Sequence, residues 1–443
     1  MTSVQSSTGA MRARTTSAPA PARPVSMGRA WAVTVMVVLL MMINFGDKAV
    51  LGLAAAPIMK ELGISAAQFG AISSSFFFLF SLSALFVGWL SKRFSTFWIL
   101  LVLALLWSIT ATPIIFAASL PMLYLSRISL GAAEGPTSPM TVHAVQKWFP
   151  ARSRGLPTAM TQIGSALGVA IASPVLGYFI AVHGWRSALV VLAIAGVVWA
   201  AAWLFIGKEG PLETLAAADS GDVAKDAQAD VRVSFWKLLF NRTTVGLMLA
   251  GIGCYWLVAG GIAWMPSLLE AKGFDFTHAA LIAGLPSVVS AASMLIIPPV
   301  LDRMVFRGRS QRACYGGGLA VVMVISALCL FLAPALTGGA LVAALVIAFG
   351  IGGVTFPLTF LVLAQYSPVK SRGALQATTT AVVTFTGVIA PAAIGALLTS
   401  AGSMAAGANT VFLVSGVLVA VCTAIGVPLI HPAATIAKLG VKA

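Results

Sequence analysis

The sequence has few charged residues, and acids are the scarcer sign. Only 9% of its 443 residues are charged, with 12 Asp and Glu against 27 Lys and Arg. Hydrophobic residues make up 59% of the chain, and the mean hydropathy is +0.98. This composition excludes an ordinary soluble domain, in which about a quarter of the residues are charged, and indicates a polytopic membrane protein. The net charge of +15 does not predict a nucleic-acid partner, because the cations are dispersed among short loops.

Cysteine and histidine are also scarce, with four residues of each. The cysteines fall in or beside apolar segments without CxxC spacing, and the histidines are scattered, so neither disulfides nor a metal site is expected. No P-loop or Gly-x-Ser-x-Gly pattern occurs. We therefore expect no cofactor and no enzymatic activity. A membrane sensor is disfavoured because the longest interior polar segment is only the stretch 207–242.

Long apolar runs are what the sequence has in abundance. A run of about 20 apolar residues is long enough to cross a bilayer as a helix. An all-α fold with an even number of spans puts both chain ends on one side of the membrane. Twelve spans are predicted, at 31–57, 67–91, 97–118, 120–145, 155–182, 186–206, 243–268, 277–301, 313–334, 338–365, 373–400 and 409–430.

The distribution of Lys and Arg predicts the orientation. Of the 27 cations, 22 lie in the two tails and in the loops on their side, and only three lie in the opposite loops. The positive-inside rule therefore places both termini in the cytoplasm of a cell whose inner (plasma) membrane holds the protein. The predicted domains are a disordered tail (1–30), a six-helix bundle (31–206), a cytoplasmic linker (207–242), a second six-helix bundle (243–430) and a C-terminal tail (431–443).

Three motifs recur about 210 residues apart and in the same order. They predict two pseudo-symmetric bundles, an arrangement that allows alternating access by rocking one bundle against the other. The matches are Pro57 and Glu61 with Pro266 and Glu270, Lys92-Arg93 with Asp302-Arg303, and the PARSRG that starts at Pro150 with the PVKSRG that starts at Pro368.

Four charged residues remain inside the predicted spans once the loop charges are assigned: Asp47, Lys48, Arg127 and Glu134. Charges at that depth are costly and usually functional. Arg127 and Glu134 are seven residues apart, about two helical turns or roughly 10.5 Å of rise, and share one helix face. A purely structural ion-pair network is the alternative interpretation.

These four residues match the needs of a proton-driven anion transporter. Lys48 and Arg127 are predicted to bind the substrate anion, and the planar fork of Arg127 is the better clamp for a carboxylate. Asp47 and Glu134 are predicted to couple transport to protons. Gln162 in the fifth span either hydrogen-bonds a substrate oxygen or joins two helices.

Three stretches carry a family resemblance. GAAEGPTSPMTVHAVQKWFPARSRG (Gly131 to Gly155), INFGDK (Ile43 to Lys48) and HGWR (His183 to Arg186) resemble the major facilitator superfamily and, within it, the anion:cation symporter family. The resemblance covers about residues 31–430. It implies the superfamily fold, a sugar acid, organic acid, phosphate or glutamate as substrate, proton transfer by Asp47 and Glu134, and anion binding by Arg127. It also suggests Thr384 as a substrate-binding residue.

The loop after the second span departs from the superfamily pattern. The sequence keeps Gly88 and Arg93 but has Lys92 and Ser95 where the pattern has Asp and Gly, whereas the second-half copy keeps Asp302 and Arg303. The resemblance implies a cytoplasmic gate formed by Gly88, Arg93, Asp302 and Arg303, which the missing acid weakens in the first half.

We therefore expect a secondary active transporter that imports a small organic anion by proton-coupled symport. An anion exchanger, or an efflux protein for drugs or metabolites with the same fold, is the alternative. Its expected partners are the anion, protons and the lipid bilayer, and it is expected to function as a monomer. The few hydroxyl and amide groups near the four charges favour a weakly hydroxylated or aromatic carboxylate as the substrate.

Overall fold

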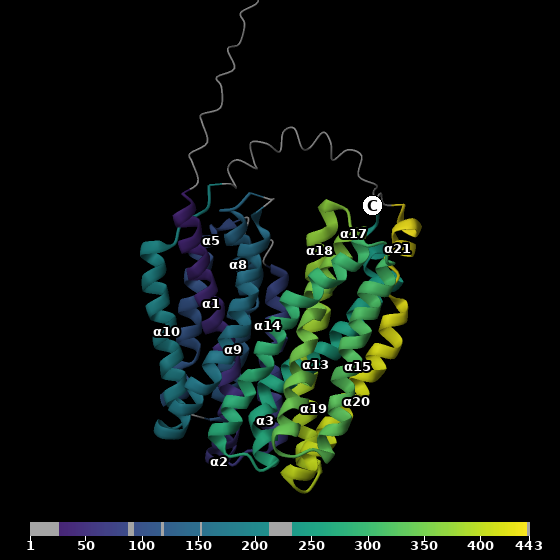
Figure 1. The fold of residues 1–443 in the computed structure, drawn as a ribbon. Coiled ribbons are helices and arrows are strands. Elements are labelled where there is room, and N and C mark those ends of the chain that lie inside the picture. Colours follow the sequence, from purple (N-terminus) through teal and green to yellow (C-terminus); the bar gives the residue numbers. More distant parts are fainter. Residues whose placement is uncertain (1–25, 87–92, 117–118, 151–152, 212–232, 441–443) are drawn as a thin grey trace, which may run out of the picture.

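The computed structural model describes residues 26–86, 93–116, 119–150, 153–211 and 233–440. Gly88, most of the predicted linker and the N-terminal tail through residue 25 lie outside these ranges. Every regular element within the described ranges is a helix, in agreement with the predicted all-α fold (Figure 1).

The first half contains six membrane-crossing stretches. The fourth is broken, because Pro136 has no backbone N–H with which to continue the helical ladder, and α7 ends at Glu134 just before it. The elements are α1 (Met27–Leu53), α2 (Ala55–Leu62), α3 (Ala66–Ser83), α5 (Thr96–Thr110) with α6 (Thr112–Phe116), α7 (Leu120–Glu134) with α8 (Thr137–Gln146), α9 (Gly155–His183) and α10 (Trp185–Ile206).

The second half repeats this number of stretches. Its fourth and fifth stretches are again interrupted, by a tight turn of helix at Ile351–Val354 and by a break at Phe385. The elements are α12 (Phe235–Leu239), α13 (Arg242–Ala271), α14 (Phe276–Phe306), α15 (Gly317–Leu332), α16 (Gly338–Gly350) with α17 (Thr355–Tyr366), α18 (Val369–Thr384) with α19 (Thr386–Ser400), α20 (Met404–Leu429) and α21 (Pro432–Leu439).

Eleven stretches within the described ranges are long and apolar enough to cross a membrane. The twelfth is α7 with α8, which the break at Pro136 divides into helices of 15 and 10 residues. Counting this broken stretch confirms the twelve predicted spans. The described ends of α1 and α21 lie at the same end of the bundle, as an even number of spans requires (Figure 1).

The contacts between the halves follow the predicted pseudo-symmetry. α3 packs against α19, and α9 packs against α14, which are the second span with the eleventh and the fifth with the eighth. Exchanging the two halves converts one of these pairs into the other. α1 packs against α13, the equivalent first spans of the two halves. The repeat seen in the sequence is therefore also a repeat of the interface.

Glycine allows backbone contact between the halves. A Cβ atom at Gly52 in α1 would lie 2.0 Å from the backbone oxygen of Ile262 in α13, and one at Gly70 in α3 would lie 2.4 Å from that of Pro391 in α19. Small residues let helix backbones approach this closely in membranes. No other residue type fits at these two positions without a shift of the helices.

Three hydrogen bonds join α3 to the eleventh span, two of them to α19 and one to the end of α18. The N–H of Ala67 donates to the Thr399 hydroxyl at 2.9 Å, and the N–H of Ala392 donates to the Ser74 hydroxyl at 3.0 Å. Further along α3, the hydroxyls of Ser81 and Thr384 lie 2.9 Å apart. These contacts extend along most of α3, so the two halves are joined here from one end of that helix to the other.

Candidate functional site

The position of α7 depends on its close contact with α3. Gly131 and Gly135 are one turn apart, and a Cβ atom at either would lie 2.0 to 2.2 Å from a backbone oxygen of α3, that of Phe76 or Phe80. The backbones of the two helices therefore touch at this point. Glu134 lies between the two glycines, so this contact sets the depth of Glu134 within the bundle.

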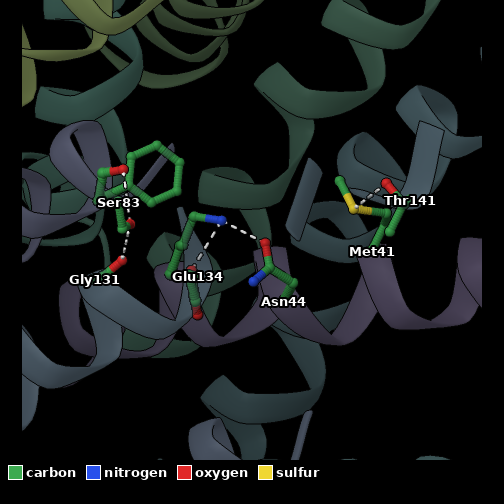
Figure 2. Close-up of polar contacts among 8 residues, drawn as sticks. Met41, Asn44, Ser83, Gly131, Glu134 and Thr141 are labelled. Atoms are coloured by element: carbon green, nitrogen blue, oxygen red, sulfur yellow. Dashed lines mark hydrogen bonds and ion pairs between the residues drawn. The ribbon is translucent and has the colours of Figure 1, made fainter. Parts of the chain in front are cut away.

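A buried ion pair joins α1 to α7. The Nζ atom of Lys48 lies 2.9 Å from Oε2 of Glu134, and the two side chains are 6% and 0% exposed (Figure 2). Lys48 also donates a hydrogen bond to the Oδ1 atom of Asn44, one turn earlier in α1. The ammonium group lies 4.1 Å from the ring centre of Phe45, a favourable cation–π distance.

Asp47 and Arg127 complete the charge cluster. Both are buried, with 6% and 4% of their surfaces exposed. Asp47 lies within electrostatic range of Arg127, Lys48 and Glu134. The structure thus brings together all four charges that the sequence singled out within the spans. The Nε atom of Arg127 has no hydrogen-bond partner among the described residues, which leaves a buried donor available.

A small cavity adjoins the cluster. Its polar lining consists of Lys48, Arg127 and Ser73, and its other walls are apolar. About 20 Å³ of free space remains, which is room for roughly one water molecule rather than for an organic anion. Binding of a substrate therefore requires the halves to separate. The apolar lining is Leu51, Gly52, Phe76 and Phe77 from the first half and Ala259, Ile262 and Ala263 from α13.

A second cavity lies within the second half and is rich in hydroxyl groups. Thr355 and Thr359 come from α17, and Thr379 and Thr380 come from α18. The hydroxyl of Thr379 is buried without a hydrogen-bond partner among the described residues. These threonines lie on helices that are remote in sequence from the four charges. The sequence-based expectation of few hydroxyl groups near the charges therefore did not take them into account.

Aromatic side chains connect the two cavities. Phe77 lines the first cavity and lies with its ring centre 5.9 Å from that of Tyr255 in α13. Tyr255 in turn lies 6.0 Å from Phe356, which lines the second cavity. Both contacts are edge-to-face, the favoured geometry for aromatic pairs. The charged cavity and the hydroxyl-rich cavity are therefore linked by a chain of three aromatic side chains.

The two uncharged residues that were predicted to bind substrate, Gln162 and Thr384, do not line the first cavity. Gln162 is an exposed residue of α9 and lines neither cavity. Thr384 is buried, and its hydroxyl bonds Ser81 across the interface between the halves. The observed contact of Thr384 is thus with the opposite half of the protein.

Two of the predicted gating residues are exposed. These are Arg93 and Arg303. Asp302 accepts a hydrogen bond of 2.8 Å from the Tyr315 hydroxyl, which joins α14 to the start of the next span within the second half. Gly88 lies outside the described residues.

The start of the predicted linker is fixed to the first half. Glu209 accepts hydrogen bonds from the N–H groups of Thr96 and Phe97 at the beginning of α5, and it forms an ion pair with Lys147. Partial burial alone would raise the pKa of Glu209, but Lys147, the N–H group of Phe97 and the hydroxyl of Thr96 lower it. An acid at a helix N-terminus is favourable because it satisfies free N–H groups.

An ion pair lies on the opposite side of the membrane, between α2 and α10. Arg186 donates two hydrogen bonds to Glu61, of 2.9 and 2.6 Å, and the indole N–H of Trp185 donates a third at 2.8 Å. These donors, Arg186 first, lower the pKa of Glu61 to about 2. Glu61 is therefore charged throughout the physiological range.

The profile of the Major Facilitator Superfamily matches residues 37–391, which is most of the chain. The chain belongs to the Major Facilitator Superfamily. The proteins of this superfamily to which it is similar are transporters, so the prediction of a transporter rather than an enzyme is confirmed.

Three similar proteins are named after the organic acids that they transport. A probable sulfoacetate transporter of Cupriavidus necator is 29% identical over 67% of this chain and 70% of its own length. A probable L-galactonate transporter of Escherichia coli is 29% identical over 62% of this chain and 63% of its own length. A hexuronate transporter of Bacillus subtilis is 28% identical over 56% of this chain and 58% of its own length.

Solved superfamily structures share the fold. A bacterial homologue of the human lysosomal transporter Spinster, in an inward-facing and occupied conformation, superposes with a TM-score of 0.74 at 18% identity, over 94% of this chain and 98% of its own. A D-xylose-proton symporter superposes with a TM-score of 0.70 at 14% identity, over 89% and 97% of the two chains.

Two neutral polar residues at the site were not predicted from the sequence. Asn44 holds Lys48, and Ser73 lines the charged cavity. Asn44 precedes Lys48 by four residues, which puts both on one helix face, and this spacing was the available signal. Nothing in the sequence distinguishes Ser73 from its neighbours Ser74 and Ser75.

Proposed function

We propose that the protein imports a small organic anion together with protons, by alternating access across the inner membrane and as a monomer. The observation that carries this proposal is the buried ion pair of Lys48 with Glu134 beside Arg127. A cation that is paired in this way is available to a substrate only after its partner carboxylate is neutralised or displaced.

Coupling follows from competition for Lys48. When Glu134 takes up a proton, it loses its charge and releases the ammonium group of Lys48. The carboxylate of the substrate then replaces Glu134 as the anionic partner of Lys48, and Arg127 supplies further donors. When the anion leaves, Lys48 returns to Glu134, and the proton is released on the same side. Asp47, within electrostatic range of Lys48 and Arg127, is proposed as a second proton carrier.

The relatives and the second cavity both support a hydroxylated acid as substrate. Two of the relatives named above are transporters of galactonate and of hexuronates, and the four threonines offer hydroxyl groups to such a chain. We therefore propose a sugar acid in preference to the weakly hydroxylated acid expected from the sequence. The carboxylate would bind at Arg127 and Lys48, and the hydroxyl groups would face Thr355, Thr359, Thr379 and Thr380.

Thr384, Gln162 and the four predicted gating residues are proposed to act in other conformations of the transport cycle. Thr384, through its bond with Ser81, is suited to hold the halves together rather than to bind substrate alone. Gln162 is kept as a candidate substrate contact in a conformation with the halves apart. The residues Gly88, Arg93, Asp302 and Arg303 are proposed to form the cytoplasmic gate when the protein opens to the other side.

Uptake by proteoliposomes tests this function. Purified protein is reconstituted, an inward proton gradient is imposed, and accumulation of D-galactonate, D-glucarate and sulfoacetate is compared with that of neutral D-galactose. Symport predicts accumulation of at least one anion that collapses when a protonophore is added. Uptake of D-galactose alone would contradict the assignment of an anion substrate. Counterflow of anion against anion without any response to the proton gradient would identify an exchanger instead.

A further inference from the structure

Among the described residues that line the charged cavity, Ser73 is the one that is polar and neutral. It lies in the middle of α3, and 6% of its surface is exposed. The same cavity is lined by Lys48 and Arg127. Three side chains that can donate hydrogen bonds, from α1, α3 and α7, therefore border one small space.

The hydroxyl of Ser73 has no hydrogen-bond partner among the described residues. Serines inside helices usually bond a backbone oxygen of the preceding turn, and a buried hydroxyl without any partner is costly. The two serines that follow are satisfied. Ser75 donates to the backbone oxygen of Ile72 at 2.7 Å, and Ser74 accepts from the N–H of Ala392. Of these three consecutive serines, Ser73 alone borders the cavity and lacks a partner.

We propose that Ser73 is a substrate-binding residue that donates a hydrogen bond to the anionic group of the substrate. The inference rests on the proposed function and deepens it. Arg127 offers its unpartnered Nε–H, Lys48 offers its ammonium group once Glu134 is neutral, and Ser73 offers its hydroxyl. The ligand group that accepts from several converging donors at once is an oxyanion, either a carboxylate or a sulfonate.

The walls of the cavity strengthen such a bond. Leu51, Phe76 and Phe77 face the space from the first half, and Ala259 and Ile262 face it from α13. Apolar walls exclude water and lower the local dielectric, so hydrogen bonds to an anion are stronger there than in solution. A hydroxyl bonded to a charged ligand contributes enough that its loss should weaken binding by roughly 10- to 100-fold.

The test compares substitutions of Ser73 with a matched control on the same helix. Ser73→Ala removes the hydroxyl, Ser73→Thr keeps it, and Ser75→Ala removes a hydroxyl that bonds its own helix. Initial rates of uptake are measured in proteoliposomes with sulfoacetate and with D-galactonate, under a fixed inward proton gradient. We expect Ser73→Ala to raise KM by about tenfold or more with little change in kcat. Ser73→Thr and Ser75→Ala should stay within about threefold of the wild-type KM.

Several outcomes separate this inference from the proposed function. If the wild-type protein transports a probe anion and Ser73→Ala has the wild-type KM, the role of Ser73 is wrong while the function stands. An equal loss of kcat in Ser73→Ala and Ser75→Ala would also overturn it, because that pattern reports damage to α3. If the wild type transports neither anion, binding of the two probes is measured by calorimetry, and absence of binding contradicts the function itself. Ser73→Cys, which keeps the size but donates weakly, replaces Ser73→Ala if that variant does not fold.

Discussion

Lys48 in α1 and Glu134 in α7 form an ion pair of 2.9 Å that is almost completely buried. Removing one partner of a buried pair strands the other charge, and this usually costs about 3–5 kcal/mol. Protonation of Glu134 neutralises its carboxylate reversibly, so a transporter can break and re-form this pair during its cycle. The pair is therefore both a stability element and the proposed point of contact between proton and substrate.

Glu134→Gln should uncouple transport from protons. A neutral amide mimics the protonated acid, so Lys48 is permanently available to the substrate. With one proton per anion, a pH gradient drives accumulation of about tenfold per pH unit. In the variant, the internal anion concentration should not rise above the external one. Counterflow without a gradient should persist. Parallel assays of both modes in one vesicle preparation check this. Wild-type pH dependence of accumulation in a correctly inserted Glu134→Gln protein would remove the proton role of this residue.

Asn44 should position Lys48. The residue is 1% exposed, and its side-chain oxygen accepts a hydrogen bond from Lys48. Asn44→Ala should raise the KM for the anion by up to about tenfold, since a hydrogen bond to a charged group is lost. Asn44→Asp should raise it further, because a new carboxylate beside Lys48 competes with the substrate.

A control for Asn44 is available in the same region. The hydroxyl of Thr141 contacts the sulfur of Met41 at 3.5 Å, a weak acceptor, one turn from Asn44 on α1 (Figure 2). Thr141→Val should leave KM near the wild-type value. Equal effects of Asn44→Ala and Thr141→Val on KM would show that Asn44 has only a packing role.

Gly131→Ala should separate α7 from α3. The added methyl group would lie 2.0 Å from the backbone oxygen of Phe76, and backbone atoms cannot rotate away. Overpacking of this kind costs typically 1–3 kcal/mol. We expect a lower Tm of the purified protein and a loss of uptake at all anion concentrations. Gly155→Ala, with no atom within 4 Å of the added group, is the control and should keep the wild-type Tm. A wild-type Tm for Gly131→Ala would contradict the tight contact.

Glu61 should give a stability difference that depends on pH. Its pKa is lowered from the ordinary value of 4.5 to about 2 in the folded protein. A depressed pKa contributes stability above the unfolded value, and this contribution is lost as the pH falls from about 4.5 toward 2. The pair with Arg186 is well exposed, so its contribution should be below about 1 kcal/mol.

Thermal unfolding of wild type and Glu61→Gln between pH 7 and pH 3 measures that contribution. The wild type should have the higher Tm at pH 7, by an amount that stays constant down to about pH 5 and then shrinks. A difference that grows on acidification would show the opposite sign of the pKa shift.

The sequence predicted the spans and the charge cluster because both depend on rules that hold residue by residue. Apolar length identifies a span, and a charge inside a span is rare enough to stand out by elimination. The neutral residues escaped prediction because asparagine and serine are ordinary in membrane helices. Whether the hydroxyl of Ser73 or of Ser75 lacks a partner depends on a rotation of α3 that only packing against α7 and α19 determines.

The sequence also could not predict that Thr384 contacts Ser81 in the opposite half. A polar residue in the eleventh span can face the substrate path or the opposite half, and the bond of Thr384 to Ser81 depends on how closely α3 approaches that span, which consists of α18 and α19. That approach depends on Gly70 and on the backbone oxygen of Pro391, which are more than 300 residues apart in the chain. Local patterns contain no information about such pairs.

The break of α7 at Pro136 also affects how the protein is made. Within the described ranges, the stretch with Arg127 and Glu134 is the one crossing whose helices do not reach the length and apolarity of an independent span. Each charged residue at mid-membrane costs about 2.5–3.5 kcal/mol during insertion. α3, which precedes α7 in synthesis, already offers the surface that Gly131 and Gly135 contact. We therefore expect insertion of α7 to depend on α3, which offers a surface against which the charged helix can pack as it enters the membrane.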